Sequence, residues 1–317
     1  MVITMNKTKV VFMGTPEFSV PVLEMLIKNY NVVGVVTQPD KPVGRKKVLT
    51  PSPIKKVALE NNITVLTPSK LRLEYESVLD LKPDIIVTCA FGQLVPKEIL
   101  EYPKYGCINV HGSLLPKYRG GAPIQKSIMN GECKTGITIM YMNEGLDTGD
   151  MISKREVLID KEDNYETLSD KLMLVGRDLL EETLPDIISC NINREEQDDE
   201  DSTYAKVIKR EDELIDFNKT SLEIYNHIRG LSPIPGAYAM LDGKVVKIYN
   251  SRISDHFHPE KKNGEIVSIY KDGIGISTKD SEIIITDIKL EGKKRMLVKD
   301  YFNGVNGEKL LGGVFNE

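Results

Sequence analysis

Cysteine is scarce in this chain, and the four cysteines present are far apart. Cys89, Cys107, Cys133 and Cys190 form no CxxC pair and have no group of histidines beside them. A disulfide framework needs paired cysteines, and a structural zinc site needs closely spaced ligands. We therefore expect neither, and we predict no metal. Cys107 is expected to fill the core, because it lies in an apolar segment.

Long apolar runs are also missing. No run approaches the roughly 18 to 20 residues that a helix needs to span a bilayer. The N-terminal run at residues 10–13 stops at Gly14, which leaves it too short for the apolar core of a signal peptide. The sequence therefore predicts a cytoplasmic protein without a membrane anchor.

Two familiar motifs of α/β enzymes are absent. The glycine-bearing turn at residues 14–16 lacks the GxGxxG spacing of dinucleotide-binding loops, so nicotinamide and flavin binding are not expected. Ser113 lies close to a histidine, but its surroundings are not the GxSxG turn that carries the nucleophile of many hydrolases. Direct transfer between two bound substrates is therefore favoured over a covalent intermediate.

The overall composition is that of a globular protein, with 317 residues, 40% of them hydrophobic and 28% charged. This length exceeds that of a usual single domain, so two domains are expected. The formal net charge of −5 argues against a protein that coats nucleic acid indiscriminately, although it allows a local basic patch.

The first half of the chain alternates strand and helix patterns. Apolar runs predict strands, and the segments between them predict helices, one with Ser19 as its N-cap and one within residues 51–61. The predicted strands cover residues 9–13, 31–37, 84–91 and 107–111. Nearly continuous Val and Ile runs separated by helices indicate an α/β fold with a doubly wound, mostly parallel sheet. We assign residues 1–189 to this domain, and we expect its ligands beyond the carboxyl ends of the strands.

The character of the chain changes near residue 190. Six acidic residues occur within residues 195–201, and we interpret residues 190–208 as a solvated acidic linker. Beyond it, Thr220 and Glu223 match a capping box at the start of a short helix. Strand-like segments separated by Asp-Gly and Asn-Gly turns follow, and they predict a small antiparallel β-barrel within residues 209–317.

Residues 107–123, CINVHGSLLPKYRGGAP, hold the most informative pattern. Asn109 and His111 are two residues apart in a predicted strand, so their side chains point to the same side. Asp147 lies in the turn GLDTGD, after another apolar segment. Taken singly, each of these residues is more often structural. Together, an amide donor, an imidazole and a carboxylate at strand ends suit chemistry at a carbonyl carbon.

The stretches HGSLLPKYRGGAP, with Asn109 before it, and GLDTGD resemble the signature of the formyltransferases that use 10-formyltetrahydrofolate. The resemblance implies that Asn109, His111 and Asp147 are the catalytic set. It also implies that Ser113, Leu114, Leu115 and Pro116 contact the folate co-substrate. The implied reaction is attack of an unprotonated amine on the formyl carbon, with Asn109 and protonated His111 holding the tetrahedral oxyanion.

The acceptor amine is indicated by another segment. Residues 40–56 carry six basic residues against one acid, and four prolines at positions 39, 42, 51 and 53 restrict the loop. A polyanionic acceptor is implied. The loop is similar to that of the family branch that formylates initiator methionyl-tRNA, in which it approaches the acceptor end. By this resemblance Arg45, Lys46 and Lys47 contact the tRNA.

The resemblance covers essentially the whole chain, and it implies a Rossmann-like catalytic domain followed by an OB-like barrel that binds tRNA. It also suggests a monomer. The barrel segment has equal numbers of basic and acidic residues, 17 of each between residues 209 and 317. The barrel could therefore bind RNA only if its basic residues are gathered on one face. The candidates for it are Lys244, Lys247, Arg252, Lys293, Lys294 and Arg295.

Three other interpretations remain open from the sequence. A formyltransferase acting on a nucleotide or nucleotide-sugar amine would keep Asn109, His111 and Asp147 but would need neither the basic loop nor the barrel. A non-catalytic RNA- or folate-binding protein would be expected to lack one of the three polar residues, and none is missing. A hydrolase would use water in place of the amine and release formate.

Overall fold

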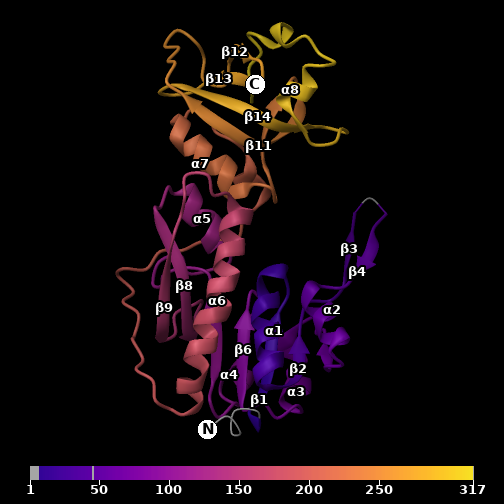
Figure 1. The fold of residues 1–317 in the computed structure, drawn as a ribbon, viewed down its shortest axis with the longest axis vertical. Coiled ribbons are helices and arrows are strands. Elements are labelled where there is room, and N and C mark those ends of the chain that lie inside the picture. Colours follow the sequence, from indigo (N-terminus) through magenta and orange to yellow (C-terminus); the bar gives the residue numbers. More distant parts are fainter. Residues whose placement is uncertain (1–6, 45, 317) are drawn as a thin grey trace. The chain divides into compact units, whose positions relative to one another are not determined.

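The computed structural model describes residues 7–44 and 46–316, so Arg45 lies outside the described residues. The chain divides into two compact units (Figure 1). The first comprises Met1–Pro123, Lys134–Leu158 and Ser169–Lys206, and the second comprises Ile124–Cys133, Ile159–Leu168 and Val207–Glu317. Two short internal segments thus belong with the C-terminal unit, which local sequence patterns do not reveal.

A seven-stranded sheet forms the centre of the first unit within the described residues, in the order β5-β2-β1-β6-β7-β8-β9. The strands are β1 (Lys9–Gly14), β2 (Asn31–Val36), β5 (Val65–Leu66), β6 (Ile85–Cys89), β7 (Cys107–His111), β8 (Lys134–Tyr141) and β9 (Met151–Leu158). Pairings from β5 to β7 are parallel, whereas β8 and β9 are antiparallel. The predicted doubly wound, mostly parallel sheet is confirmed, and its apolar runs are buried as such sheets require.

Helices cover this sheet, as the alternating pattern predicts. They are α1 (Val20–Asn29), α2 (Pro53–Glu60), α3 (Glu76–Leu79), α4 (Lys97–Leu100) and α6 (Tyr165–Ile188), with short 3-10 turns at η2 (Glu17–Ser19) and η3 (Leu71–Leu73). Ser52 caps α2 by accepting the amide of Lys55 at 3.0 Å. Ser19 occupies the N-cap of α1, but its hydroxyl donates to the carbonyl of Cys89 at 2.6 Å instead of capping. The long helix α6 packs closely on β7, because a Cβ at Gly176 would lie 3.0 Å from Val110.

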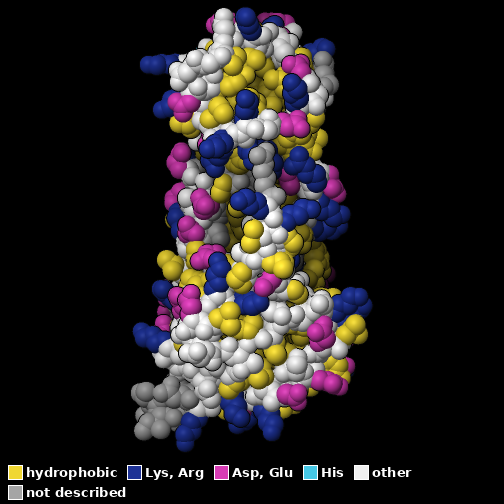
Figure 2. Space-filling model, turned by 90° about the vertical axis from the view of Figure 1, so that its right-hand side faces the viewer, with side chains coloured by type: hydrophobic (Ala, Val, Ile, Leu, Met, Phe, Trp, Pro, Cys, Tyr) yellow, Lys and Arg dark blue, Asp and Glu magenta, His cyan; other side chains and the backbone are white. Residues whose placement is uncertain are grey.

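The basic segment expected as a loop is a β-hairpin. Strand β3 (Lys41–Val43) pairs antiparallel with β4 (Val48–Thr50), and Gly44 and Lys47 adopt positive φ in the turn. We attribute the hairpin to the turn at Gly44, a residue that adopts positive φ without steric cost, a signal that the prolines obscured. Figure 2 shows the face seen from the right-hand side of Figure 1, where β3 and β4 are labelled, with Lys and Arg side chains scattered among hydrophobic ones.

The second unit contains α5 (Pro123–Met129), apart from its first residue, and α7 (Ser221–Leu231). The predicted capping box is confirmed, because Thr220 accepts the amide of Glu223 and Glu223 accepts the amide of Thr220. Its antiparallel sheet runs in the order β10-β11-β14-β13-β12, with β15 beside β14. The elements are β10 (Ala237–Leu241), β11 (Lys244–Ser254), β12 (Ile266–Tyr270), β13 (Gly273–Ser277), β14 (Glu282–Leu290), β15 (Met296–Leu297), α8 (Val298–Tyr301), η4 (Arg210–Glu213) and η5 (Gly307–Leu310).

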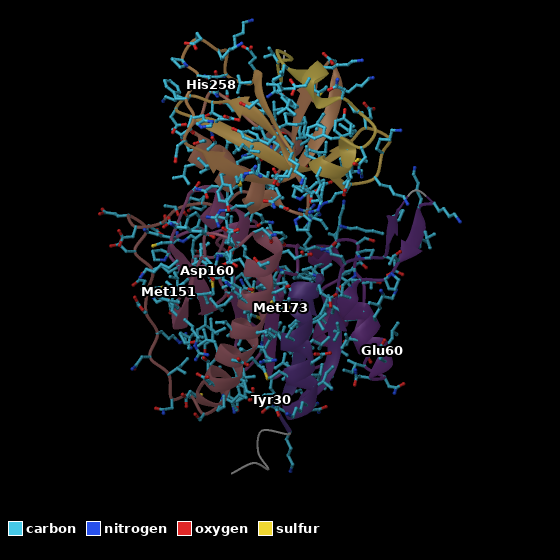
Figure 3. All side chains as sticks on the ribbon, turned by 45° about the horizontal axis from the view of Figure 1, so that its top comes forward. Tyr30, Glu60, Met151, Asp160, Met173 and His258 are labelled. Carbon is cyan, nitrogen blue, oxygen red and sulfur yellow. The ribbon has the colours of Figure 1, made fainter. Side chains whose placement is uncertain are left out.

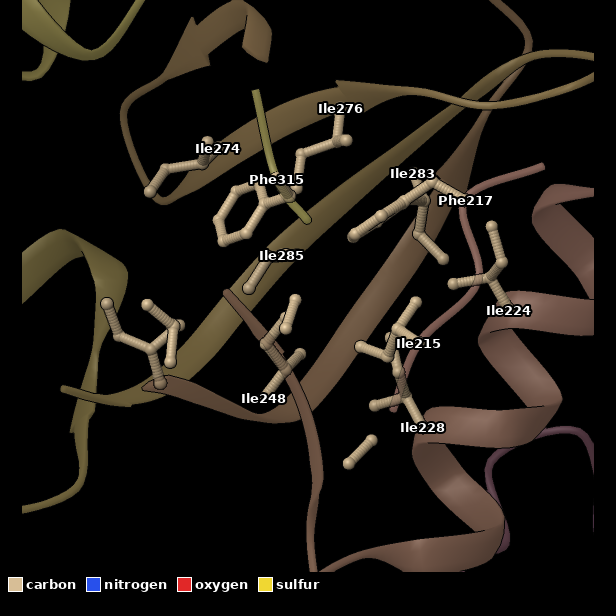
Figure 4. Packing of buried hydrophobic residues seen from close by; sticks show 14 of the residues in the cluster. Ile215, Phe217, Ile224, Ile228, Ile248, Ile274, Ile276, Ile283, Ile285 and Phe315 are labelled. Atoms are coloured by element: carbon tan, nitrogen blue, oxygen red, sulfur yellow. The ribbon is translucent and has the colours of Figure 1, made fainter. Parts of the chain in front are cut away.

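The C-terminal segment joins the two edge strands of this sheet. The amide of Ile266 in β12 donates to Gly313, and Phe315 donates to Gly264. On the other side, Asn316 and Met240 of β10 exchange two hydrogen bonds of 2.7 and 2.8 Å. The sheet therefore wraps around one apolar core, which Figure 4 shows with isoleucines and two phenylalanines at its centre. This agrees with the antiparallel architecture predicted from the strand and turn signals.

None of the helices among the described residues combines the length and apolar character needed to cross a bilayer.

Candidate active site

Asn109 and His111 lie on β7 as the two-residue spacing predicts, toward its carboxyl end. Asn109 pairs with Thr88 of β6 in the parallel register, and the Thr88 hydroxyl donates to Asn109 Oδ1 at 2.8 Å. The other end of the amide, Nδ2, faces Asp147 Oδ1 at 3.4 Å. The reverse orientation would set two oxygens against each other. Thr88 therefore fixes the amide so that its N–H donors face the site.

His111 is almost fully buried, with 5% of its surface exposed. Its Nε2 lies 3.0 Å from the carbonyl oxygen of Tyr118, and its Nδ1 lies 3.6 Å from Asp147 Oδ2. A carbonyl oxygen can only accept, so Nε2 carries a proton. Nδ1 is therefore the ring nitrogen that faces the Asp147 carboxylate.

Asp147 reaches this position from the loop after β8. Its backbone has a φ of 53°, in the left-handed region that non-glycine residues seldom adopt. The carboxylate accepts the amide of Gly120 at 2.8 Å through Oδ2, while Oδ1 faces Asn109. The three polar residues selected from the sequence are thus brought together, although Asp147 lies on a different element.

A donor pair and a carboxylate in this arrangement can stabilise an oxyanion and accept a proton. Asn109 Nδ2 and His111 Nδ1 are both on the Asp147 side of the strand end. The carboxylate places a negative charge beside them. Such a set supports addition to a carbonyl carbon, in which negative charge grows on the carbonyl oxygen and a nucleophile loses a proton.

The SLLP segment lies directly after β7. Ser113 and Leu115 are buried; the Ser113 hydroxyl donates to the carbonyl of Lys117 at 2.6 Å, and Leu115 packs with Met140 and Met151. Leu114 and Pro116 are partly accessible. In this conformation the accessible side chains of the segment are therefore those of Leu114 and Pro116.

The acidic segment contributes contacts that local sequence reasoning missed. Gln197 is only 8% exposed, and its Nε2 donates to the carbonyls of Asp147 and Gly149 at 2.9 and 2.7 Å. Its Oε1 accepts Arg119 Nε at 3.0 Å. The neighbouring acidic residues are exposed, so the acidic composition of the segment gave no indication that Gln197 is buried. Its only distinguishing mark in the sequence is that it is an uncharged amide within an acidic run. Thr88, a polar residue within the buried strand β6, had a comparable signal.

Two of the three cations expected to meet RNA on the hairpin are described. Lys46 and Lys47 are exposed, whereas Lys55 at the start of α2 forms an ion pair with Asp40 at 2.8 Å. Part of the positive charge counted in the sequence is thus neutralised, whereas Lys41 of β3 and Lys56 of α2 are exposed like the turn lysines.

The six barrel candidates separate into two groups. Arg252 pairs with Asp272 at 2.9 Å and Arg295 with Asp287 at 2.8 Å, while Lys247 approaches Glu213 at 3.5 Å. The remaining three, which are exposed and have no ion pair among the described residues, are Lys244, Lys293 and Lys294.

Cys89 and Cys107 are buried, and burial raises the pKa of each thiol to about 12. Cys107 packs in the core as expected. Cys133 and Cys190 are exposed. Over residues 7–44 and 46–316, no group of three or more His, Cys, Asp or Glu side chains is arranged to hold a metal ion.

Comparison with known proteins gives two family matches. Formyl transferase matches residues 8–184, and the formyl transferase C-terminal domain matches residues 207–306. The methionyl-tRNA formyltransferase of Bacillus subtilis (strain 168) is 56% identical over 306 residues, covering 95% of this chain and 96% of the relative. That of Staphylococcus aureus (strain MW2) is 50% identical over 311 residues, covering 96% and 100%.

Solved structures share the fold at lower identity. An N-formyltransferase from Helicobacter canadensis, in complex with folinic acid and dTDP-3-aminofucose, has a TM-score of 0.66 at 23% identity. The match covers 91% of this chain and all of that chain (100%). The methionyl-tRNA formyltransferase from Clostridium thermocellum has a TM-score of 0.56 at 20% identity, with 89% and 98% covered.

Proposed function

The chain belongs to the formyltransferase family, among the methionyl-tRNA formyltransferases, and from this premise we propose how it works. It transfers the formyl group of 10-formyltetrahydrofolate to the free amino group of methionyl initiator tRNA. The observation that carries the mechanism is the convergence of Asn109, His111 and Asp147 at the end of β7.

In the first step the unprotonated amine attacks the formyl carbon, and a carbon–nitrogen bond forms while the carbonyl oxygen becomes an oxyanion. Asn109 Nδ2 and the proton on His111 Nδ1 stabilise this oxygen, since His111 Nε2 is already engaged with Tyr118. Asp147 balances the imidazolium charge and takes part in removing the proton from the attacking nitrogen. No covalent enzyme intermediate is needed.

In the second step the tetrahedral intermediate collapses. The bond between the formyl carbon and the folate nitrogen N10 breaks, N10 receives a proton, and the oxyanion again becomes a carbonyl. The products are the formylated amine and tetrahydrofolate. The proton released by the amine balances the one that N10 accepts, and the His111–Asp147 pair is placed to carry it.

We assign the folate co-substrate to the segment Ser113, Leu114, Leu115 and Pro116, with Leu114 and Pro116 supplying its accessible side chains. The tRNA is assigned to Arg45, Lys46 and Lys47 and to the C-terminal barrel. Residues 1–189 would then be catalytic, 190–208 an acidic linker, and 209–317 the tRNA-binding barrel. We also propose that the protein acts as a monomer in the cytoplasm.

Acceptor competition tests the function directly. Purified protein is given 10-formyltetrahydrofolate with initiator methionyl-tRNA, elongator methionyl-tRNA or a dTDP-linked amino sugar. Preferential formylation of the initiator tRNA supports the proposal. Formylation of the amino sugar with both tRNAs untouched would overturn the acceptor assignment. Formate release without any acceptor, at the rate of transfer, would instead indicate a hydrolase.

A further inference from the structure

The two ring nitrogens of His111 each face a residue with a left-handed backbone. Nδ1 faces the Asp147 carboxylate, and Nε2 faces the carbonyl of Tyr118, whose φ is 61°. Neither residue is a glycine, so each conformation is disfavoured unless surrounding contacts hold it. The orientation of the imidazole therefore depends on what holds Asp147 and Tyr118.

Both residues are held from one short segment, residues 195–205. Gln197 donates its two N–H groups to the carbonyls of Asp147 and Gly149. Thr203 accepts the amide of Tyr118 at 2.9 Å through its hydroxyl. Gln197 Oε1 and both Gln197 hydrogens are engaged, so the amide can adopt only one orientation.

This segment is fastened to the first unit at both ends. Glu195 exchanges two backbone hydrogen bonds of 2.8 and 2.9 Å with Met151, the first residue of β9, which is labelled in Figure 3. At the other end, Arg119 donates its amide to Thr203 at 2.8 Å and accepts that of Ala205 at 2.7 Å. These bonds hold the backbone of the segment close to Gln197 at one end and at Thr203 at the other.

A buried cation completes the arrangement. Arg119 is 1% exposed; its Nε donates to Gln197 and its Nη1 pairs with Asp199 at 2.7 Å. The guanidinium holds the Gln197 oxygen by a hydrogen bond, so the Gln197 nitrogen faces the carbonyls of Asp147 and Gly149. The acidic run thus supplies the counter-charge for a side chain that would be costly to bury alone.

We propose that Gln197, with Thr203, is a positioning residue for formyl transfer: residues 195–205, which belong to the first compact unit, hold the residues that face the two ring nitrogens of His111. This inference rests on the proposed function. It assigns the segment a part in the chemistry beyond that of a solvated linker. Neither side chain reaches the reacting atoms; each acts through the residue it holds.

Gln197→Glu is the decisive variant. The new carboxylate still accepts from Arg119, which preserves the buried pair, but it opposes the carbonyls of Asp147 and Gly149 where donors stood. We expect kcat to fall about 10- to 100-fold, as small displacements of catalytic groups do. The KM values of folate and tRNA should be unchanged. Glu196→Gln, at the exposed neighbouring position, is the matched control and should leave both constants unchanged.

A double-mutant cycle with Asp147→Asn separates positioning from a general loss of structure. If Gln197 acts through Asp147, Gln197→Glu should lower the single-turnover rate far less in the Asp147→Asn protein than in the wild type. Equal loss in both backgrounds, or a wild-type kcat for Gln197→Glu, overturns the proposal. Enzyme in excess over substrate keeps the slow variants measurable.

Two substitutions of Thr203 test the proposal if the Gln197→Glu protein does not fold. Thr203→Ser retains the hydroxyl that accepts the Tyr118 amide and should keep kcat, whereas Thr203→Val removes it and should lower kcat. Equal rates for the two variants contradict the role of the segment. Wild-type protein is assayed alongside, so failure of the proposed function would appear as no transfer by any protein.

Discussion

The Oδ2 atom of Asp147 lies 3.6 Å from Nδ1 of His111, and the same oxygen accepts the backbone amide of Gly120 at 2.8 Å. The carboxylate therefore cannot rotate away from the imidazole without losing a hydrogen bond. Because His111 Nε2 faces the carbonyl of Tyr118, Nδ1 is the ring nitrogen on the Asp147 side.

Removal of either oxyanion donor should slow the reaction with the fold intact. We expect Asn109→Ala and His111→Ala each to lower kcat by about 10²- to 10³-fold, since one lost donor in such a site has this effect. Steady-state kinetics with initiator methionyl-tRNA measures the change, and circular dichroism checks the fold. Near wild-type turnover in either variant would remove the role assigned to that residue.

Neutralising the hairpin turn should weaken tRNA binding rather than folate binding. Lys46 and Lys47 are exposed, so each is free to meet a phosphate. For Lys46→Ala/Lys47→Ala we expect a higher KM for tRNA and a salt dependence of log K shallower by about 0.7 to 0.9 for each phosphate that is no longer neutralised. Lys28→Ala, at the far end of α1, is the control. An unchanged slope would argue against the hairpin.

The barrel cations should differ in their effect on RNA affinity. Arg252 and Arg295 are paired with carboxylates, whereas Lys293 and Lys294 are not paired among the described residues. We expect Lys293→Ala/Lys294→Ala to reduce tRNA affinity and its salt dependence more than Arg252→Ala. Filter binding at several salt concentrations measures both. The opposite ranking would show that ion pairing does not select the RNA-facing cations.

Thiol reactivity should divide the four cysteines into pairs. A pKa of about 12 for Cys89 and Cys107 leaves only about one thiol in 10⁴ ionised at pH 8, and the thiolate is the reactive form. We expect iodoacetamide to modify Cys133 and Cys190 in the folded protein, with the buried pair reacting only after denaturation. Mass spectrometry of peptides locates the label. Rapid labelling of Cys107 would contradict its packing.

Acidification should destabilise the chain through His227. Burial lowers the pKa of His227 below the ordinary value of 6.5, so between the two values the unfolded chain binds more protons. The free energy of unfolding therefore falls as the pH drops through 6.5. We expect His227→Asn to lose less stability than the wild type between pH 7.5 and 5.5, measured by urea denaturation. Equal losses would assign the effect to other groups.

Local patterns predicted much of the fold. The Val and Ile runs indicated the parallel strands, the capping box marked the start of α7, and Asp-Gly and Asn-Gly pairs marked the turns of the second sheet. The β3–β4 hairpin was expected as a loop, and residues 124–133 and 159–168 were not expected to pack with the C-terminal unit. These depend on contacts between distant segments, to which periodicity is insensitive.

The sequence by itself determined that Asn109 and His111 share one side of a strand end, because side-chain alternation is a local property of the backbone. The sequence also contains the motifs that identify the family of the chain. Only the tertiary structure decided that Asp147 meets His111, that Gln197 and Thr203 hold the two residues facing its nitrogens, and which barrel cations are already paired. Such contacts join residues far apart in sequence, and they exist only once packing has fixed the loops.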